Sequence, residues 1–186
     1  MKRNHGTTKR IAADALFTAL GLIVFLIESL FPPLFIPGAK MGLANIFSLA
    51  ALVLYGPADA FAVVAARTLL GSMFAGNIAS LMYSLTGGCA AMAVSAILIY
   101  ALYPKVSIIA VSIVAAIMHN IVQNLVFVGI SQTALTFSYM PYLALLGILS
   151  GAIVGLAVML IFKRVPLSVF ERACGQKLEG KTCEKQ

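Results

Sequence analysis

The sequence predicts an all-α integral membrane protein with six transmembrane helices, and two observations lead to this fold class. The first is composition: the 186 residues are 61% hydrophobic and only 10% charged, whereas soluble domains carry about 25% charged residues. The second is the length of the apolar runs, which reach the roughly 20 residues that a membrane-spanning helix needs. Together they exclude a soluble domain.

The charge distribution predicts the topology. The net charge is +7, and most Lys and Arg residues lie near the two ends of the chain. Such residues stay on the cytoplasmic side of a membrane, so this pattern is an orientation signal and not a nucleic-acid-binding surface. We expect a cytoplasmic basic segment at 1–8, a transmembrane domain at 9–164 and a cytoplasmic charged tail at 165–186. Membrane lipid is a secondary partner of these basic ends.

Six apolar segments are expected between residues that break helices. They cover residues 9–31, 41–55, 57–74, 80–103, 106–130 and 139–162. No small-residue cleavage site follows the first segment, so it is read as an uncleaved helix. The second segment is only about 22 Å long as a helix, which leaves a short span or half of a re-entrant hairpin. Counting it as a crossing keeps both basic ends on one side.

Glycines mark the later segments. The third segment starts with Pro57 directly after Gly56, a position that tolerates proline. The pair Gly87-Gly88 in the fourth segment indicates close helix packing or a backbone opened toward a ligand, and packing is the commoner case. In the sixth segment glycines recur every fourth residue, which is typical of a helix contact. These are Gly147, Gly151 and Gly155.

Arg67 is the most unusual residue of the apolar region, because it lies near the middle of the third segment. Insertion of an arginine there costs roughly 2.5–3.5 kcal/mol, so such a residue usually faces a wet cavity or a partner. We expect Arg67 on the wall of a polar pocket that opens outward. The alternative is a structural arginine that pairs with carbonyls or with Glu28, which is too near its segment's end to be assigned a functional role.

The fifth segment carries four polar residues on one helical face. An amide-rich face is costly against lipid and should point into the bundle, although hydrogen bonds between helices, worth about 0.6 kcal/mol each, are an alternative explanation. The predicted binding site for a small molecule with a polar or anionic group consists of Lys40, Asn45, Arg67, Asn77, His119, Asn120, Gln123 and Asn124.

No enzyme, metal or cofactor motif accompanies this site. The sequence contains no HExxH, no nucleophile elbow and no P-loop. Cys89 lies in an apolar run, and the spacing of Cys174 and Cys183 matches no zinc pattern. The sequence therefore predicts a chain that is not an enzyme and that cannot power transport alone.

A strip of small residues lies near the start of the first segment, at Ala12, Ala15 and Ala19. Ala15 and Ala19 have the i, i+4 spacing that lets another membrane helix approach closely. The strip is a candidate docking surface for a partner, and ordinary alanines of an apolar helix are the alternative.

Four stretches carry a resemblance to a known family. They are PGAKMGLANI at 37–46, RTLLGS at 67–72, Gly76-Asn77 and SLMYSLTGG at 80–88. Over residues 10–165 the chain resembles the small bacterial membrane proteins known as heptaprenyl diphosphate synthase component I, also called the Gx transporter family. That family is similar in size and six-helix layout to substrate-binding S components of energy-coupling-factor transporters.

The resemblance implies two functions. As an S-component-like subunit, the chain would capture a small molecule from outside the bacterial cell membrane, with coupling and ATPase subunits as partners and the first-helix alanines as the docking surface. As a component of a prenyl diphosphate synthase, it would be noncatalytic, because the aspartate-rich DDxxD motif that binds magnesium and diphosphate is absent from the sequence. Arg67 and Lys40 could then meet a diphosphate.

Overall fold

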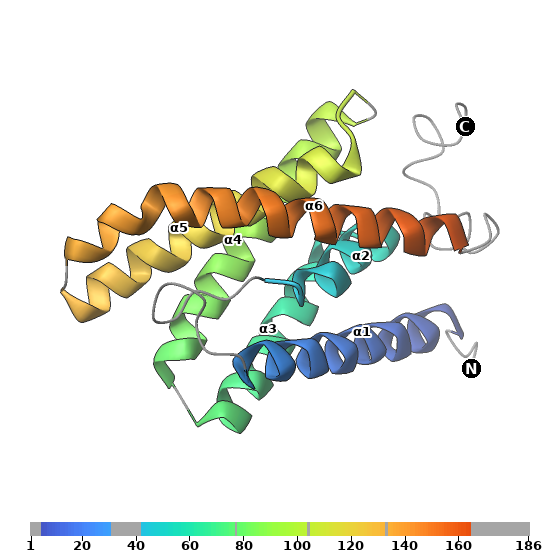
Figure 1. The fold of residues 1–186 in the computed structure, drawn as a ribbon. Coiled ribbons are helices and arrows are strands. Elements are labelled where there is room, and N and C mark those ends of the chain that lie inside the picture. Colours follow the sequence, from blue (N-terminus) through green and yellow to red (C-terminus); the bar gives the residue numbers. More distant parts are fainter. Residues whose placement is uncertain (1–4, 31–41, 77, 104, 133, 165–186) are drawn as a thin grey trace.

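The computed structural model describes residues 5–30, 42–76, 78–103, 105–132 and 134–164. Every regular element in these ranges is helical, which confirms the predicted all-α class (Figure 1). The elements are α1 (His5–Leu30), α2 (Asn45–Tyr55), α3 (Pro57–Ala75), α4 (Ile78–Leu102), α5 (Ile108–Ser131), the 3₁₀ helix η1 (Ala134–Tyr139) and α6 (Met140–Arg164).

Five of these helices are long and apolar enough to cross a membrane: α1, α3, α4, α5 and α6. The chain is therefore a multi-pass membrane protein. Helix α2 has 11 residues, which is about 16 Å, whereas the hydrocarbon core of a bilayer is about 30 Å thick. The sixth predicted crossing, like the cytoplasmic placement of the termini, stays a prediction.

The starts of α1 and α2 differ most from the expected residues, whereas the other helices start within two residues of them. Helix α1 begins at His5, four residues before the predicted start at 9. Helix α2 begins at Asn45 and not at position 41, because a turn precedes it. Gly42 has φ of +74°, a conformation that glycine adopts without steric cost, and its carbonyl accepts a hydrogen bond from the Asn45 amide at 2.9 Å.

The turn between α2 and α3 is formed as the sequence predicts. Gly56 has φ of +105°, and Pro57 is the first residue of α3, where its missing N–H costs no intrahelical hydrogen bond.

Gly76 ends α3 in the left-handed conformation, which is common after a helix. At the start of α5 the Ser107 hydroxyl accepts a hydrogen bond from the Ala110 amide at 3.1 Å, as an N-cap residue does.

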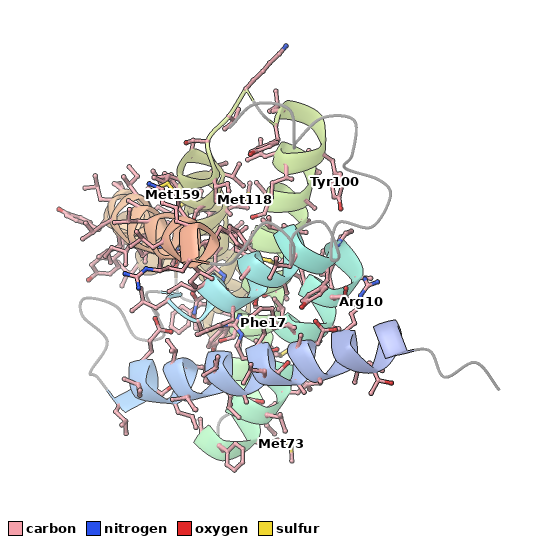
Figure 2. All side chains as sticks on the ribbon, turned by 90° about the vertical axis from the view of Figure 1, so that its right-hand side faces the viewer. Arg10, Phe17, Met73, Tyr100, Met118 and Met159 are labelled. Carbon is pink, nitrogen blue, oxygen red and sulfur yellow. The ribbon has the colours of Figure 1, made fainter. Side chains whose placement is uncertain are left out.

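Helices α3 to α6 run back and forth, so that consecutive helices are antiparallel, and α1 lies along the edge of the bundle (Figure 1). Helix α1 packs mainly against α3 and α2. In Figure 2 Phe17 projects from α1 toward α2, and its ring centroid lies 6.5 Å from that of Phe47. Further along the same helix, the ring of Phe25 fills the space over Gly71, where a Cβ atom would be 2.5 Å from it.

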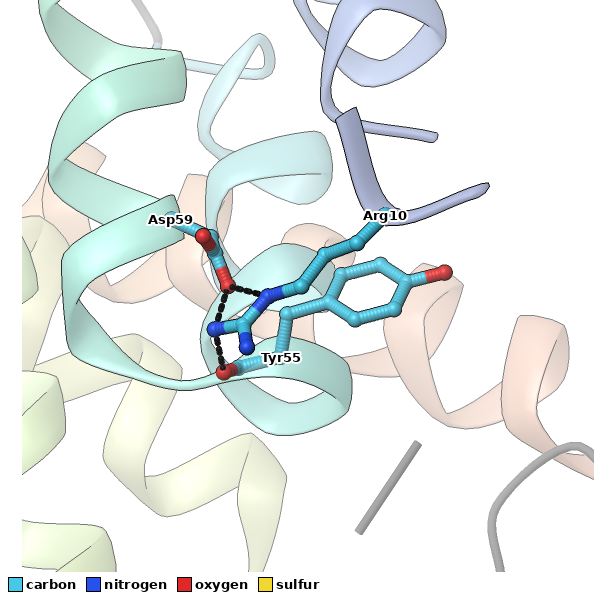
Figure 3. Close-up of polar contacts among 3 residues, drawn as sticks. All are labelled: Arg10, Tyr55 and Asp59. Atoms are coloured by element: carbon cyan, nitrogen blue, oxygen red, sulfur yellow. Dashed lines mark hydrogen bonds and ion pairs between the residues drawn. The ribbon is translucent and has the colours of Figure 1, made fainter. Parts of the chain in front are cut away.

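One end of α1 is attached to the α2–α3 turn by Arg10 (Figure 3). Its Nε donates a hydrogen bond to Asp59 Oδ2 at 2.7 Å, and its Nη2 pairs with the same carboxylate and donates to the Tyr55 carbonyl at 2.8 Å. Asp14 interacts with Asp59 at the same place. The two aspartates are far apart in the sequence, so the sequence did not indicate that they lie close together in the fold.

Helix α6 is in close contact with α5 through its glycines, as predicted from their spacing. A Cβ atom on Gly151 would lie 2.6 Å from the Ile113 Cα, and one on Gly155 would lie 2.7 Å from the Ile109 Cα. Both distances are far below van der Waals contact with backbone atoms. Only glycine permits the two helix backbones to lie this close, so the stripe serves packing.

The apolar core lies between α2, α3, α4, α5 and α6, whereas large apolar side chains also cover the outside of the bundle. Leu49, Val64 and Met92 are almost fully buried, and Ile23, Ile97 and Leu149 are exposed. Exposed apolar side chains on several helices are what a lipid-covered surface requires, in agreement with the membrane assignment.

Candidate functional site

Arg67 is buried near the middle of α3, with 3% of its surface exposed. Its Nη2 donates a hydrogen bond to Asn45 Oδ1 of α2 at 3.0 Å. Its Nε N–H is buried and has no hydrogen-bond partner among the described residues. A buried donor without a partner costs free energy of about 1–3 kcal/mol. One hydrogen-bond donor of the guanidinium therefore has no partner in the part of the chain that the structure describes.

Two glycines on neighbouring helices make room for Arg67. A Cβ atom on Gly21 of α1 would lie 2.8 Å from the Arg67 Cδ, so the aliphatic part of the arginine packs directly on the α1 backbone. A Cβ atom on Gly88 of α4 would lie 2.8 Å from Val64 Cγ1 and 4.0 Å from Arg67 Nη2. Arg67 thus lies where α1, α2, α3 and α4 meet. Sequence reasoning did not single out Gly21.

Glu28 supplies a negative charge that acts favourably on Arg67. Its Oε1 also accepts a hydrogen bond of 2.8 Å from the backbone amide of Leu43, just before α2. A carboxylate at this position complements both the arginine and the N-terminal end of a helix. From the sequence, Glu28 was expected at most as a structural partner of Arg67, because it lies close to the end of its helix. The position of Glu28 favours the alternative in which Arg67 has an internal counter-charge.

The polar face of α5 points into the bundle, as predicted. His119, Asn120, Gln123 and Asn124 are each between 4% and 6% exposed. Asn120 Nδ2 donates a hydrogen bond to the Leu143 carbonyl of α6 at 2.9 Å. Asn120 therefore links α5 to α6 by a hydrogen bond. This is the alternative explanation that the sequence left open for the polar face.

Gly87 explains how His119 fits between α4 and α5. A Cβ atom on Gly87 would lie 3.1 Å from His119 Nδ1 and 3.1 Å from the His119 carbonyl oxygen. The pair Gly87-Gly88 consequently serves packing: the first glycine makes room for His119, and the second for Val64 and Arg67. The alternative of a backbone opened toward a ligand has no support in these contacts.

Several of the predicted site residues lie near one another in the structure, and two others lie outside the described residues. Gly42 lies next to both Asn45 and His119: a Cβ atom there would be 3.2 Å from Asn45 Nδ2 and 3.9 Å from His119 Cδ2. Asn45 thus contacts Arg67 and has Gly42 as a common neighbour with His119, and the other three lie on the same α5 face as His119. We call the six residues the polar layer: Asn45, Arg67, His119, Asn120, Gln123 and Asn124. Lys40 and Asn77 lie outside the described residues.

The polar layer suits an anionic group better than a metal ion. Its one full charge is the buried guanidinium of Arg67, and guanidinium binds carboxylate and phosphate with two parallel hydrogen bonds. Within the described ranges no group of three or more His, Cys, Asp or Glu side chains could hold a metal ion. The remaining members of the layer are amides and an imidazole, which can orient a ligand by donating and accepting hydrogen bonds. Of these, Asn45 already accepts a hydrogen bond from the arginine.

The three alanines of the predicted docking strip, Ala12, Ala15 and Ala19, are all exposed on α1. Their side chains take no part in covering the core. The surface that they form is open to lipid or to another helix.

Comparison with known proteins identifies the family. The sequence model of the family described as heptaprenyl diphosphate synthase component I matches residues 17–161, which is most of the chain and nearly the range over which the resemblance was predicted. No curated protein matches the chain. The match covers the region from α1 to α6, including Arg67 and the rest of the polar layer. The chain therefore belongs to the heptaprenyl diphosphate synthase component I family.

Proposed function

We propose that this chain is the noncatalytic membrane component of a heptaprenyl diphosphate synthase, and that its polar layer receives the anionic head group of a prenyl diphosphate. The observation that carries the proposal is the buried Arg67, whose Nε donor has no partner within the described ranges. In a surrounding of low dielectric constant, a guanidinium interacts with a phosphate far more strongly than it does in water.

The chemistry of the ligand explains why such a synthase would have a membrane component. Each CH₂ group of a lipid chain contributes about 0.8 kcal/mol to membrane binding, so a heptaprenyl chain partitions strongly into the bilayer. A soluble catalytic subunit would have to release such a product into lipid. A membrane subunit that holds the head group between its helices keeps the apolar chain in the surroundings it prefers.

Binding at Arg67 requires the helices around it to separate, because the arginine is closely packed in this structure. Helix α1 covers it through Gly21 and rests mainly on α3 and α2. Glu28, near the end of α1, also supplies the counter-charge that an entering phosphate would replace. Movement of α1 would therefore uncover the arginine and remove the competing carboxylate together.

The noncatalytic role is supported by the acidic residues of the chain. The sequence contains no DDxxD motif. Asp14 and Asp59 do come together in space, but the Arg10 guanidinium already pairs with Asp59. A partner subunit rich in aspartate would supply the magnesium-dependent chemistry.

Co-purification tests this function. The full chain, affinity-tagged and expressed at its native level in its own host, should bring down a soluble prenyl diphosphate synthase that carries aspartate-rich motifs. Recovery of ATPase subunits and a membrane coupling subunit, with no such synthase, would contradict the proposal and favour uptake of a small molecule.

Uptake is the second candidate function, and the exposure of the α1 alanines favours it. If Ala15 and Ala19 form a docking surface for a coupling subunit, replacing both by Leu should abolish complex formation, because bulky side chains hold helices apart. Ala62 is a matched control, since it is also exposed but lies on α3. Equal complex yield for the Ala15→Leu, Ala19→Leu double variant and for Ala62→Leu would rule out docking through this strip.

A further inference from the structure

A small cavity lies in the bundle where α2 meets α4, α5 and α6. It gives the centre of a water molecule about 10 Å³ of space. The cavity is lined by Gly42, Asn45, Leu49, Ala91, Met92, Ser95, Ser112, Ala115, Ala116 and Val154. A single water needs about 10–15 Å³ measured in this way, so the cavity admits one water molecule and excludes any organic head group.

The polar side chains of the lining come from three different helices. Asn45 of α2, Ser95 of α4 and Ser112 of α5 are between 0% and 7% exposed. The Ser95 Oγ has no hydrogen-bond partner among the described residues, although the side chain is fully buried. Leaving a buried hydroxyl without a partner costs about 1–3 kcal/mol. A buried polar group is normally hydrogen-bonded, and the cavity beside this hydroxyl has the size of one water molecule.

We propose that this cavity is a binding site for one structural water molecule, which bridges Ser95, Ser112 and Asn45. Three polar groups are within the two to four partners that a buried water typically has. The water satisfies the Ser95 hydroxyl and links the short helix α2 to α4 and α5. The Asn45 side chain that it contacts is the one that accepts the hydrogen bond from Arg67, so the water also extends the polar layer. This proposal does not depend on the function of the chain.

A cation is a poor occupant of this cavity. The Asn45 side chain on its wall is already bonded to the positive guanidinium of Arg67, and none of the lining residues carries a negative charge. A neutral molecule that both donates and accepts hydrogen bonds meets no such repulsion, and only water is small enough.

The sign of a stability change tests the proposal. With a bound water, Ser95→Ala removes a hydrogen bond and should lower the Tm of the purified protein in detergent by about 2–4 °C, the shift that one typical hydrogen bond gives in a chain of this size. In a dry cavity the same substitution deletes an unsatisfied hydroxyl and should leave the Tm unchanged or raise it.

Ser48 of α2 is the matched control. Its hydroxyl is also fully buried without a partner among the described residues, but it does not line the cavity. Ser48→Ala should therefore leave the Tm unchanged or raise it. A Tm loss for Ser95→Ala alone supports the water site, whereas no loss, or an equal loss in both variants, overturns it. Electron density for a water within hydrogen-bonding distance of Ser95 Oγ would support it directly, and an empty cavity in a map that resolves other buried waters would overturn it.

Discussion

Replacing Gly151 by Ala should destabilise the protein severely, although the change adds a single methyl group. The new Cβ atom would lie 2.6 Å from the Ile113 Cα and 2.8 Å from the Ser112 carbonyl oxygen. Backbone atoms cannot rotate away as a side chain does, so α6 must move off α5. Overpacking of this kind costs about 1–3 kcal/mol and at times more, which corresponds to a Tm loss of at least about 2–4 °C.

Gly129 gives the matching control on α5, because its Cβ would have no atom within 4 Å apart from the local backbone of its own helix and its chain neighbours. Gly129→Ala should raise the Tm slightly, since Ala is favoured over Gly in a helix by up to about 1 kcal/mol. Thermal melting of both variants in the same detergent measures the difference. If Gly151→Ala melted at or above the wild-type temperature, the close α5–α6 contact would be wrong.

Replacing Arg67 by Gln should lower the affinity for heptaprenyl diphosphate by roughly tenfold to a hundredfold. Hydrogen bonds to charged groups contribute about 1.5–3 kcal/mol, and each 1.4 kcal/mol is a factor of ten in binding. Glutamine keeps a polar side chain with two N–H donors at this buried position and carries no charge that must be buried, so the loss of Tm should be small by comparison. Equilibrium binding and thermal melting of the same preparation separate the two effects.

Arg10→Gln is the control for this substitution, because it removes the same charge at an exposed site, where Arg10 pairs with Asp59. Exposed ion pairs contribute about 0–1 kcal/mol, and affinity for the ligand should stay at the wild-type value. Full binding by the Arg67 variant together with a large Tm loss would show that Arg67 and Glu28 form a structural pair and nothing more.

The features that the sequence predicted correctly are those that depend on local pattern. Apolar length and breaker residues were enough to place the helices, and Gly56-Pro57 marked the turn between α2 and α3. The buried face of α5 followed from the cost of exposing four polar groups to lipid. The spacing of Gly151 and its neighbours predicted a helix contact, and the structure shows that α5 is the helix they contact.

The features that were missed depend on contacts between residues far apart in the chain. Nothing in the local sequence indicates that Gly21 packs on Arg67 or that Glu28 accepts a hydrogen bond from the Leu43 amide. Membrane helices are apolar on most faces, so periodicity alone does not say which face meets which neighbour. The late start of α2 has a local cause, the turn at Gly42, but a glycine inside an apolar run does not by itself end a helix.

For the predicted binding site, too, the sequence identified unusual residues but not the contacts between distant ones. The sequence identified Arg67, Asn45 and His119 as unusual for a membrane segment. In the structure Asn45 contacts Arg67 and has Gly42 as a common neighbour with His119. It also gives Asn120 a partner on α6, which supports a packing role for that residue. Binding of a ligand by the polar layer stays a prediction, as do the contributions of Lys40 and Asn77.

Native mass spectrometry of the full chain, purified gently from its own host membranes, tests the central claim most directly. The proposed function predicts a bound molecule with the mass of heptaprenyl diphosphate, in a ratio of about one to one, which is lost in the Arg67→Gln variant and kept in Arg10→Gln. A bound water-soluble metabolite without an isoprenoid chain, or a prenyl diphosphate retained equally by both variants, would contradict the account.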